Sequence, residues 1–254
     1  MEKKYILTEE TKEVGGHILH KIQAVRDFGG VQKGDLGGWV ESEENLSHDG
    51  DCWIFDNGRV FDNGRVFGDG RVSDNGWVFG DGKVFGNGEV YGNGWVFGDG
   101  KVFGNGEVYG NGRVYGNGKV FGDGRVSDNG WVYDNGWVYD NGWVFGNGKV
   151  FDNGRVFDNG RVSDDGRVFG NAKIGFNAYI SSPRSYFVQG PIGSRNDFLT
   201  CYLDKDKKIY AVTGCFCGSI EVFVKKVKAV HGMNRWAKQY LKAAEMARVM
   251  LSGD

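Results

Sequence analysis

Residues 77–94 read WVFGDGKVFGNGEVYGNG, and residues 95–112 repeat the same eighteen letters. Each copy contains a shorter unit of six: Val, an aromatic residue, Gly or Asp, Asn or Asp, Gly, and a long side chain. The pattern begins near Ile54 and fades after Tyr179, a span of 126 residues that holds 21 hexads or seven units of eighteen. A regular internal repeat of this kind fixes the fold class before other features are considered.

Each hexad combines a short strand with a tight turn. Val and Phe favour extended backbone, whereas Asn-Gly and Asp-Gly tolerate positive φ and close turns. Three strands and three turns make a triangular coil of eighteen residues, and coils stacked about 4.8 Å apart would pair as parallel strands. Ser replaces the aromatic residue after Val only at Ser73, Ser127 and Ser163, whose separations are multiples of eighteen. We therefore predict a mainly β chain whose repeats form a three-sided solenoid of about seven coils.

The alternation of side chains along a strand assigns the inside and the outside of this solenoid. In the triplet Arg65-Val66-Phe67, Val66 faces inward if Arg65 faces water, and Phe67 then faces outward. The position four after each Val would lie at an inner corner, where the chain has Gly almost throughout and Ala only at Ala172 and Ala178. The sequence thus predicts a bore of valines with rings and charges on the outer surface.

The segment before the repeats is predicted to close one end of the solenoid. Alternating apolar and polar residues in 3–28, joined near Gly15-Gly16, indicate a β-hairpin. Leu36 lies eighteen residues before Ile54, which predicts a first, irregular coil. A solenoid needs caps because its open ends expose strand edges and apolar bore. We assign residues 1–53 to an N-terminal β cap with this first coil, and 54–182 to the hexapeptide-repeat β-helix.

The composition changes abruptly after residue 182, and 183–254 is predicted to form a small C-terminal α+β module. Short strands are expected near 186–188, 198–203 and 208–213. Residues 219–231 are predicted to form one helix, and Asn234 to cap a second helix that runs to about Leu251.

The hexads resemble the hexapeptide repeats of left-handed parallel β-helices. The flanking segments, with GGWV at 37–40, DCWI at 51–54 and GPIGSRND at 190–197, resemble those of a group of uncharacterised bacterial and prophage proteins. The resemblance covers nearly the whole chain and implies a left-handed winding, with no established activity for the group. The chain departs from the usual pattern by having Gly where Ala is common.

Composition limits the partners and the compartment. The formal net charge is −2 and the pI about 6.1, so no general attraction to nucleic acid or membrane is expected, and a nucleic-acid partner is unlikely on this ground. Four Cys in 254 residues do not suggest a disulfide scaffold, and no apolar run approaches eighteen residues. No signal segment is evident, so a cytoplasmic location is expected. We predict no cofactor and no metal.

The distribution of His argues against the chemistry that left-handed β-helices often perform. Acyl transfer in such families uses a His from the coils as general base, and others bind zinc through three His. The four His of this chain are His17, His20, His48 and His231, and none lies between 54 and 179. The sequence therefore leans away from an enzyme.

The outward positions form ladders that suggest an interaction surface. Sorted by eighteen, they place aromatic and basic residues in register on two faces, and aromatic and Arg residues are favoured at interfaces. The predicted interaction face consists of Phe67, Phe85, Phe103, Phe121, Tyr139, Phe157, Trp77, Trp95, Trp131, Lys83, Lys101 and Lys119. The alternative is structural: the rings stack across strands, Lys and Arg stems cover them, and turn carboxylates such as Asp81 and Asp99 offset the charge.

A weaker candidate site lies where the coils meet the C-terminal module. Arg195, Asp197 and His231 are its predicted residues, although 190–197 lacks the spacing of a phosphate-binding P-loop and is more typical of a plain turn. Cys215 and Cys217 lack the spacing of a zinc knuckle and are expected to be buried structural thiols.

The leading hypothesis is a non-catalytic structural or interaction solenoid that self-associates through its aromatic and Lys/Arg ladders as a homo-oligomer or polymer. One alternative is a hexapeptide-type transferase with a site at the junction with the C-terminal module, marked by a deep pocket that contains His231, Arg195 or Asp197. A second alternative is a phage-encoded module that binds an unidentified host macromolecule.

Overall fold

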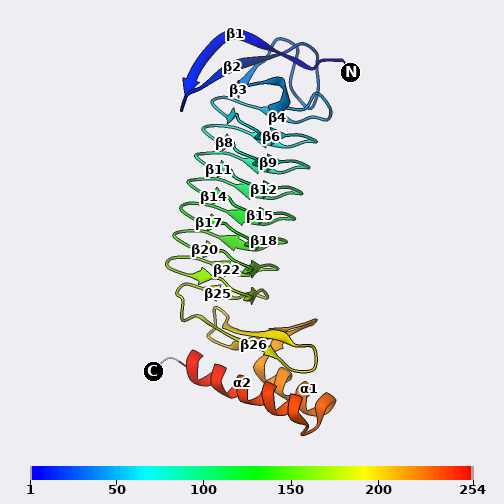
Figure 1. Ribbon diagram of the computed structural model, residues 1–254, viewed down its shortest axis with the longest axis vertical. Helices are drawn as coiled ribbons and strands as arrows, with labels where there is room; N and C mark the ends of the chain where they lie inside the picture. Colours follow the sequence, from blue (N-terminus) through cyan, green and yellow to red (C-terminus); the bar gives the residue numbers. More distant parts are fainter. Residues whose placement is uncertain (1, 253–254) are drawn as a thin grey trace.

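A computed structural model describes residues 2–252 and has the shape of a rod (Figure 1). Two strands at the N-terminal end, β1 (Tyr5–Val14) and β2 (His17–Ala24), form the predicted hairpin. Short parallel strands follow in successive coils, and a small sheet with two helices closes the other end. The predicted fold class is confirmed, with about eight turns once the irregular first coil is included.

Three sheets make the sides of the rod, and each regular coil contributes one two-residue strand to each side. The seven-stranded sheet contains β6 (Arg65–Val66), β9 (Lys83–Val84), β12 (Lys101–Val102), β15 (Lys119–Val120), β18 (Trp137–Val138), β21 (Arg155–Val156) and β24 (Lys173–Ile174). The eight-stranded sheet contains β4 (Trp53–Ile54), β7 (Arg71–Val72), β10 (Glu89–Val90), β13 (Glu107–Val108), β16 (Arg125–Val126), β19 (Trp143–Val144), β22 (Arg161–Val162) and β25 (Tyr179–Ile180). The ten-stranded sheet contains β1, β2, β3 (Leu36–Val40), β5 (Arg59–Val60), β8 (Trp77–Val78), β11 (Trp95–Val96), β14 (Arg113–Val114), β17 (Trp131–Val132), β20 (Lys149–Val150) and β23 (Arg167–Val168). The repeat strands pair in parallel, whereas β1 and β2, and β2 and β3, pair antiparallel.

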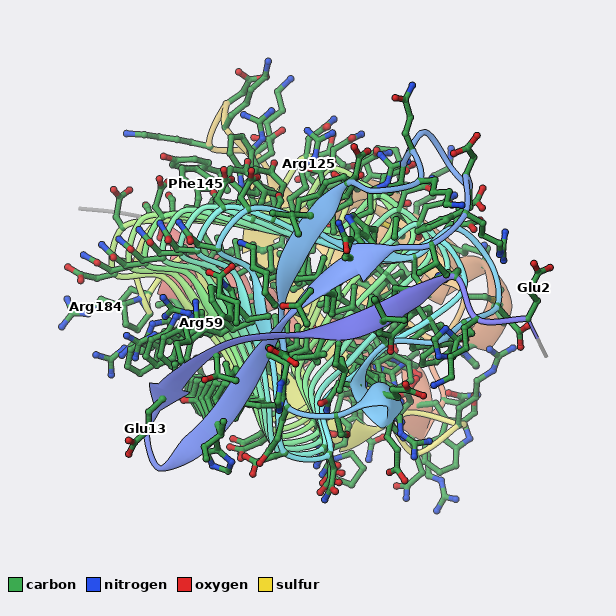
Figure 2. The ribbon with its side chains drawn as sticks, turned by 90° about the horizontal axis from the view of Figure 1, so that it is seen from above. Glu2, Glu13, Arg59, Arg125, Phe145 and Arg184 are labelled. Carbon is green, nitrogen blue, oxygen red and sulfur yellow. The ribbon has the colours of Figure 1, made fainter. Side chains whose placement is uncertain are left out.

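The register between coils is eighteen residues, as the repeat predicts. Val84 pairs with Val102, and Val102 with Val120, so identical positions stack along the axis. From Val72 to Val168 every Val of the hexads is fully buried, which confirms the valine-lined bore. Figure 2, seen along the axis, shows side chains projecting outward around the rod, with Arg59 and Arg125 on different sides.

Steric contact between coils explains why the inner corners require glycine. A Cβ built on Gly64 would lie 2.6 Å from the carbonyl oxygen of Val78, and one built on Gly100 would lie 2.6 Å from that of Val114. In each case the clash is with the backbone of the next coil, which cannot move aside like a flexible side chain. Ala172 occupies this position in the last coil, on which no further coil of the solenoid stacks. The close stacking of coils therefore accounts for Gly where hexapeptide repeats commonly have Ala.

The first coil is present, but its predicted register was wrong. Val40 pairs with Val60 and Leu46 with Val66, offsets of twenty residues, because the connection at 47–52 carries two extra residues. Leu36 is 58% exposed and pairs with Gln23 of β2 instead of lining the bore. A short 3-10 helix, Glu43–Asn45, forms the turn of this coil between the buried residues Val40 and Leu46.

The C-terminal module covers the last coil. An antiparallel sheet of β26 (Tyr186–Ile192), β27 (Asp197–Leu203), β28 (Ile209–Thr213) and β29 (Phe216–Ser219) precedes the helices α1 (Ile220–His231) and α2 (Arg235–Leu251). Ser219 and Asn234 cap the helices, as the pattern predicted for Asn234, whereas β29 was not foreseen. Tyr202 of β27 is fully buried in the same core as the valines, so one core crosses both proposed boundaries, and the division at 53 and 182 stays a prediction.

Candidate functional site: an unpaired cation ladder beside an amide ladder

The outward side chains of the seven-stranded sheet form an unusual column of positive charge. Along this sheet the column reads Arg65, Lys83, Lys101, Lys119, Trp137, Arg155 and Lys173, each pairing with the next. Ion pairs close its two ends: Arg65 lies 4.0 Å from Glu44, and Lys173 lies 3.4 Å from Asp197. Between them, Lys83, Lys101, Lys119 and Arg155 have no carboxylate partner within 4.0 Å among residues 2–252.

On the eight-stranded sheet, Arg side chains form ion pairs with Glu side chains of neighbouring coils. Arg71 lies 3.9 Å from Glu89 of the next coil, and Arg125 lies 3.7 Å from Glu107. The hydroxyl of Tyr91 also donates to Glu107 at 3.2 Å. Two neighbouring carboxylates, Glu89 and Glu107, thus lie between two Arg residues on this face, and each pairs with one of them. Opposite charges on neighbouring strands stabilise a sheet.

The ten-stranded sheet places indole rings beside several of its cations. The guanidinium of Arg113 lies 4.8 Å from the ring centre of Trp95 and 5.4 Å from that of Trp131. Lys149 lies 4.6 Å from Trp131 on its other side. Cation–π contacts stabilise such an arrangement. Lys149 and Arg167 are neighbours on this sheet, so two adjacent cations occur here, whereas the seven-stranded sheet has the run of three, Lys83, Lys101 and Lys119.

The corners between the sheets carry ladders of Asn, and two of these ladders bond to themselves. Asn87 donates to Asn105 at 3.1 Å, and Asn105 donates to Asp123 at 3.0 Å. On a second corner, Asn111 accepts from Asn93 at 3.5 Å and donates to Asn129 at 3.2 Å. Each amide there has used part of its hydrogen-bonding capacity along the rod.

The third corner, beside the cation column, lacks such bonds. Asn117, Asn135 and Asn153 are exposed, and in the part of the chain that the structure describes their side chains form no hydrogen bond to one another. Each amide keeps both donors and its acceptor free of protein partners. A column of free amides therefore runs parallel to the column of free cations.

The two columns enclose a groove that we call the axial groove. One stretch, of about 420 Å³, is lined by Asp99, Lys101, Asn117, Lys119, Asn135, Trp137, Asn153 and Arg155. A second stretch, of about 300 Å³, shares Asn153 and Arg155 and continues over Asn171, Lys173, Asn196, Asp197 and Phe198. The groove thus follows the rod axis and ends against the C-terminal module. The first stretch holds three cations against one carboxylate.

The predicted aromatic residues stack as regular ladders. Successive ring centres along Phe67, Phe85, Phe103, Phe121, Tyr139 and Phe157 lie 4.8 to 5.3 Å apart. Trp77 stacks on Trp95 at 5.2 Å, whereas Trp131 is separated from them by Arg113. The predicted residues therefore occupy two faces, with Lys83, Lys101 and Lys119 beside the Phe ladder and the Trp residues on the ten-stranded sheet. Cross-strand stacking of this kind contributes stability, and the role in association stays a prediction.

The structure brings two of the three predicted junction residues into one pocket. Arg195 and His231 line a cavity of about 280 Å³ in the C-terminal module, with apolar side chains from α1 and α2. Asp197 instead pairs with Lys173 and accepts hydrogen bonds from the backbone N–H groups of Phe198 and Gly214. Burial of Asp197 opposes its ionisation, yet these donors and the ammonium hold its pKa below the ordinary value.

A thiol that the sequence analysis misjudged also lines this pocket. Cys215 and Cys217 are exposed, so their expected burial was wrong, whereas Cys52 and Cys201 are buried. The guanidinium of Arg195 lies 3.8 Å from the sulfur of Cys215, and this contact lowers the pKa of the thiol. Cys215 directly precedes β29, and that strand was not predicted.

A second cluster of polar groups ties the hairpin to the coils. His17 Nδ1 lies 3.0 Å from Glu41, and its Nε2 lies 3.4 Å from Asp62. Glu41 also accepts a hydrogen bond of 2.7 Å from the backbone N–H of Asp62. The three side chains offer ligand atoms within 4.8 Å of one another, a spacing compatible with a divalent cation, and ion pairing accounts equally well for the arrangement.

The amide wall of the axial groove was missed by sequence reasoning. Asn117, Asn135 and Asn153 recur at intervals of eighteen, three residues after Val, and this periodicity was readable. So was the absence of Glu from the column of Lys101, in contrast to the column of Glu89. The absence of amide-to-amide bonds on this corner needed coordinates.

Comparison with known proteins finds a partial sequence similarity. No family model matches the chain. Over 66 residues it is 33% identical to the "Uncharacterized acetyltransferase YdcK" of Escherichia coli (strain K12), a stretch that covers 23% of this chain and 20% of that protein. The chain thus aligns with about a fifth of that relative's length. No helix among residues 2–252 is long and apolar enough to cross a membrane. Together with the solenoid, the similarity fits a protein of the hexapeptide-repeat β-helix kind.

Proposed function

We propose that this chain is a non-catalytic interaction rod that holds a linear anionic macromolecule in the axial groove. The observation that carries the proposal is the run of three neighbouring cations, Lys83, Lys101 and Lys119, without a carboxylate partner among residues 2–252. The longest such run on either of the other two sheets is one pair, Lys149 and Arg167. A partner with repeated negative charges supplies the missing counter-charges.

The electrostatic argument rests on the coil spacing. Unit charges about 4.8 Å apart repel by roughly 1 kcal/mol even at the dielectric constant of water. Half-buried ladder positions such as Lys101 and Lys119 have less than full access to water, and this increases the repulsion. An anionic chain along the groove converts that repulsion into attraction.

Binding to a generic polyanion tests this proposal. We expect fluorescently labelled dextran sulfate to bind the protein with an affinity that falls as salt rises, because the contacts are charged. The double variant K101Q/K119Q should weaken binding roughly tenfold, about 1.4 kcal/mol. The matched variant R71Q/R125Q removes two cations from the eight-stranded sheet and should leave binding within about twofold. Equal losses in the two variants would refute the groove as the binding surface.

Self-association through the aromatic ladders is the competing form of an interaction role. It is favoured by the exposure of rings at the ends of these ladders, where Phe67 is 36% and Phe169 is 44% exposed. Polar and charged residues in β1, the outer edge of the ten-stranded sheet, oppose growth by strand addition, so lateral contacts are the expected mode. Sedimentation velocity up to high concentration decides this: a clean monomer refutes self-association and leaves the groove proposal intact.

A second candidate function is acyl transfer in the C-terminal pocket. It is favoured by the convergence of Arg195, His231 and the thiol of Cys215 on one cavity, and by the name of the relative. His231 would serve as the general base that the coils lack. Calorimetric titration with acetyl-coenzyme A, with His231→Ala as the control, tests this candidate. Absence of binding to the unmodified protein would refute it.

A further inference from the structure

We infer that the anionic partner of the axial groove is an acidic polysaccharide, a linear chain of sugars that carry carboxylates and free hydroxyls. This inference rests on the proposed function and specifies the chemistry of the partner. It depends on the two walls of the groove, which differ in what they recognise.

The cationic wall fits carboxylates. Lys101, Lys119 and Arg155 face the groove without carboxylate partners anywhere in residues 2–252, and Asp99 stands alone against them in the first stretch. The pair Lys173–Asp197 closes the C-terminal end. From Lys101 to Lys173 the sheet advances four coils, about 19 Å at the spacing of paired strands. This length accommodates several sugar units in extended form.

The amide wall fits hydroxyls. A primary amide both donates and accepts hydrogen bonds, and so does a sugar hydroxyl, so the two match in either orientation. Asn117, Asn135 and Asn153 present such amides at every coil. On the other two corners part of each ladder is bonded, as Asn87 is to Asn105, while the exposed Asn141, Asn147 and Asn159 form no amide-to-amide bond among the described residues. The corner of Asn117, Asn135 and Asn153 is the one whose open amides line the groove beside the unpaired cations.

The aromatic content of the groove disfavours nucleic acid. Single-stranded nucleic acid binding relies on a series of aromatic side chains on which successive bases stack. Among the described residues the groove offers one indole, Trp137, and one phenyl ring, Phe198, in separate stretches. Lys119 and Arg155 approach the indole of Trp137 to 4.7 and 4.6 Å from the coils on either side of it. A single ring flanked by two cations offers no row of surfaces on which successive bases could stack.

The experiment compares three probes on the full-length chain. The probes are sodium polygalacturonate, its fully methyl-esterified form, and a polyphosphate of comparable charge, each titrated by calorimetry at low salt. We expect polygalacturonate to bind, the ester to bind at least tenfold more weakly because its carboxylates are gone, and polyphosphate to bind more weakly than polygalacturonate because it lacks hydroxyls.

Variants of the amide wall separate the two walls. N117A/N135A should weaken polygalacturonate about fivefold or more and leave polyphosphate within twofold. N87A/N105A removes amides from a self-bonded corner as the matched control and should leave both probes unchanged. Thermal melts check that each variant is folded.

The outcomes distinguish the two levels of the proposal. Tighter binding of polyphosphate than of polygalacturonate, or equal losses of both probes in N117A/N135A, overturns the polysaccharide inference and leaves the polyanion function standing. Failure of every anionic probe, including dextran sulfate, overturns the proposed function itself.

Discussion

The guanidinium carbon of Arg155 lies 4.6 Å from the ring centre of Trp137, its neighbour one coil away on the seven-stranded sheet. Lys119 approaches the same ring to 4.7 Å from the other side. Trp137 is therefore the one uncharged member of the cation column from Arg65 to Lys173, and a carboxylate there would reach two free cations.

Replacing this indole by a carboxylate should remove polyanion binding. In Trp137→Glu the new side chain can pair with Lys119 and Arg155, as Glu107 pairs with Arg125 on the eight-stranded sheet. We expect binding of dextran sulfate to fall at least tenfold, while stability changes by no more than about 1 kcal/mol, because exposed ion pairs and cation–π contacts have similar values.

Trp143→Glu is the matched control, because Trp143 also lies between two Arg residues, Arg125 and Arg161, on the eight-stranded sheet. It should leave binding within about twofold. A similar loss of binding in both variants would contradict the assignment of the partner to the axial groove.

Removing one cation from the middle of the column should not cost stability. Lys101 has Lys83 and Lys119 as its strand neighbours, so Lys101→Gln relieves repulsion and should raise stability by up to about 0.5 kcal/mol at low salt. Arg125→Gln breaks the pair with Glu107 and should lower it by a similar amount. Urea denaturation measures both, and at 1 M salt, where the screening length is about 3 Å, the difference should vanish. Destabilisation by Lys101→Gln would mean that other groups already neutralise the column.

The inner-corner glycines should resist substitution. The Cβ of Gly100→Ala would lie 2.6 Å from the carbonyl oxygen of Val114, so the coils must separate locally, at a cost of about 1–3 kcal/mol. Ala172→Gly, at the same position in the last coil, should cost no more than about 1 kcal/mol from added backbone freedom. Thermal denaturation compares the two. Tolerance of Gly100→Ala would show that the stack accommodates alanine and that another cause fixes these glycines.

The contact between hairpin and coils should depend on pH. A hydrogen bond to Glu41 raises the pKa of His17, and Asp62 adds to this effect. Because the pKa of His17 is higher in the folded state, its ion pairs stabilise the fold fully below the unfolded-state pKa of about 6.5. This stabilisation is lost as pH rises through the folded-state pKa. Burial of Glu41 opposes its ionisation, but the hydrogen bond with His17 lowers its pKa below the ordinary value. The stabilisation that ionised Glu41 contributes is therefore lost as pH falls below about 4.5.

The melting-temperature difference between the unmodified protein and His17→Gln should therefore be largest between about pH 4.5 and 6.5 and shrink toward pH 9. His231→Gln, far from this contact, is the control. A difference that grows with rising pH would contradict the ion-paired assignment and favour a metal ion bound by the neutral imidazole.

Much of the fold was predictable because one short pattern recurs. Three hexads close a coil, so identical residues stack, and the inward position of Val66 implies that of every other Val in register. The departures occur where the repeat breaks. Two extra residues at 47–52 make Val40 the partner of Val60, twenty residues on, and Leu36 pairs with Gln23 instead of lining the bore. Periodicity carries no information about such an insertion. β29 lies outside the repeat, and with it the exposure of Cys215.

The candidate site was predictable in its composition and not in its bonding. The columns of Lys101 and Glu89 follow from the period of eighteen. Whether a charge meets a partner depends on side-chain geometry between coils, as the contact of Arg125 with Glu107 illustrates. The same holds for the amides, since Asn105 and Asn117 occupy equivalent turn positions and only the first bonds to its neighbour.

Lysine footprinting of the complex tests the central claim most directly. The protein is acetylated with a limiting amount of an amine-reactive reagent, with and without sodium polygalacturonate, and the labelled positions are quantified by mass spectrometry. The account predicts that Lys101 and Lys119, which line the groove, become at least about fivefold less reactive on binding. Lys149 of the ten-stranded sheet should keep its reactivity. Equal protection of Lys149, or unchanged reactivity of Lys101 and Lys119 in a saturated complex, would contradict it.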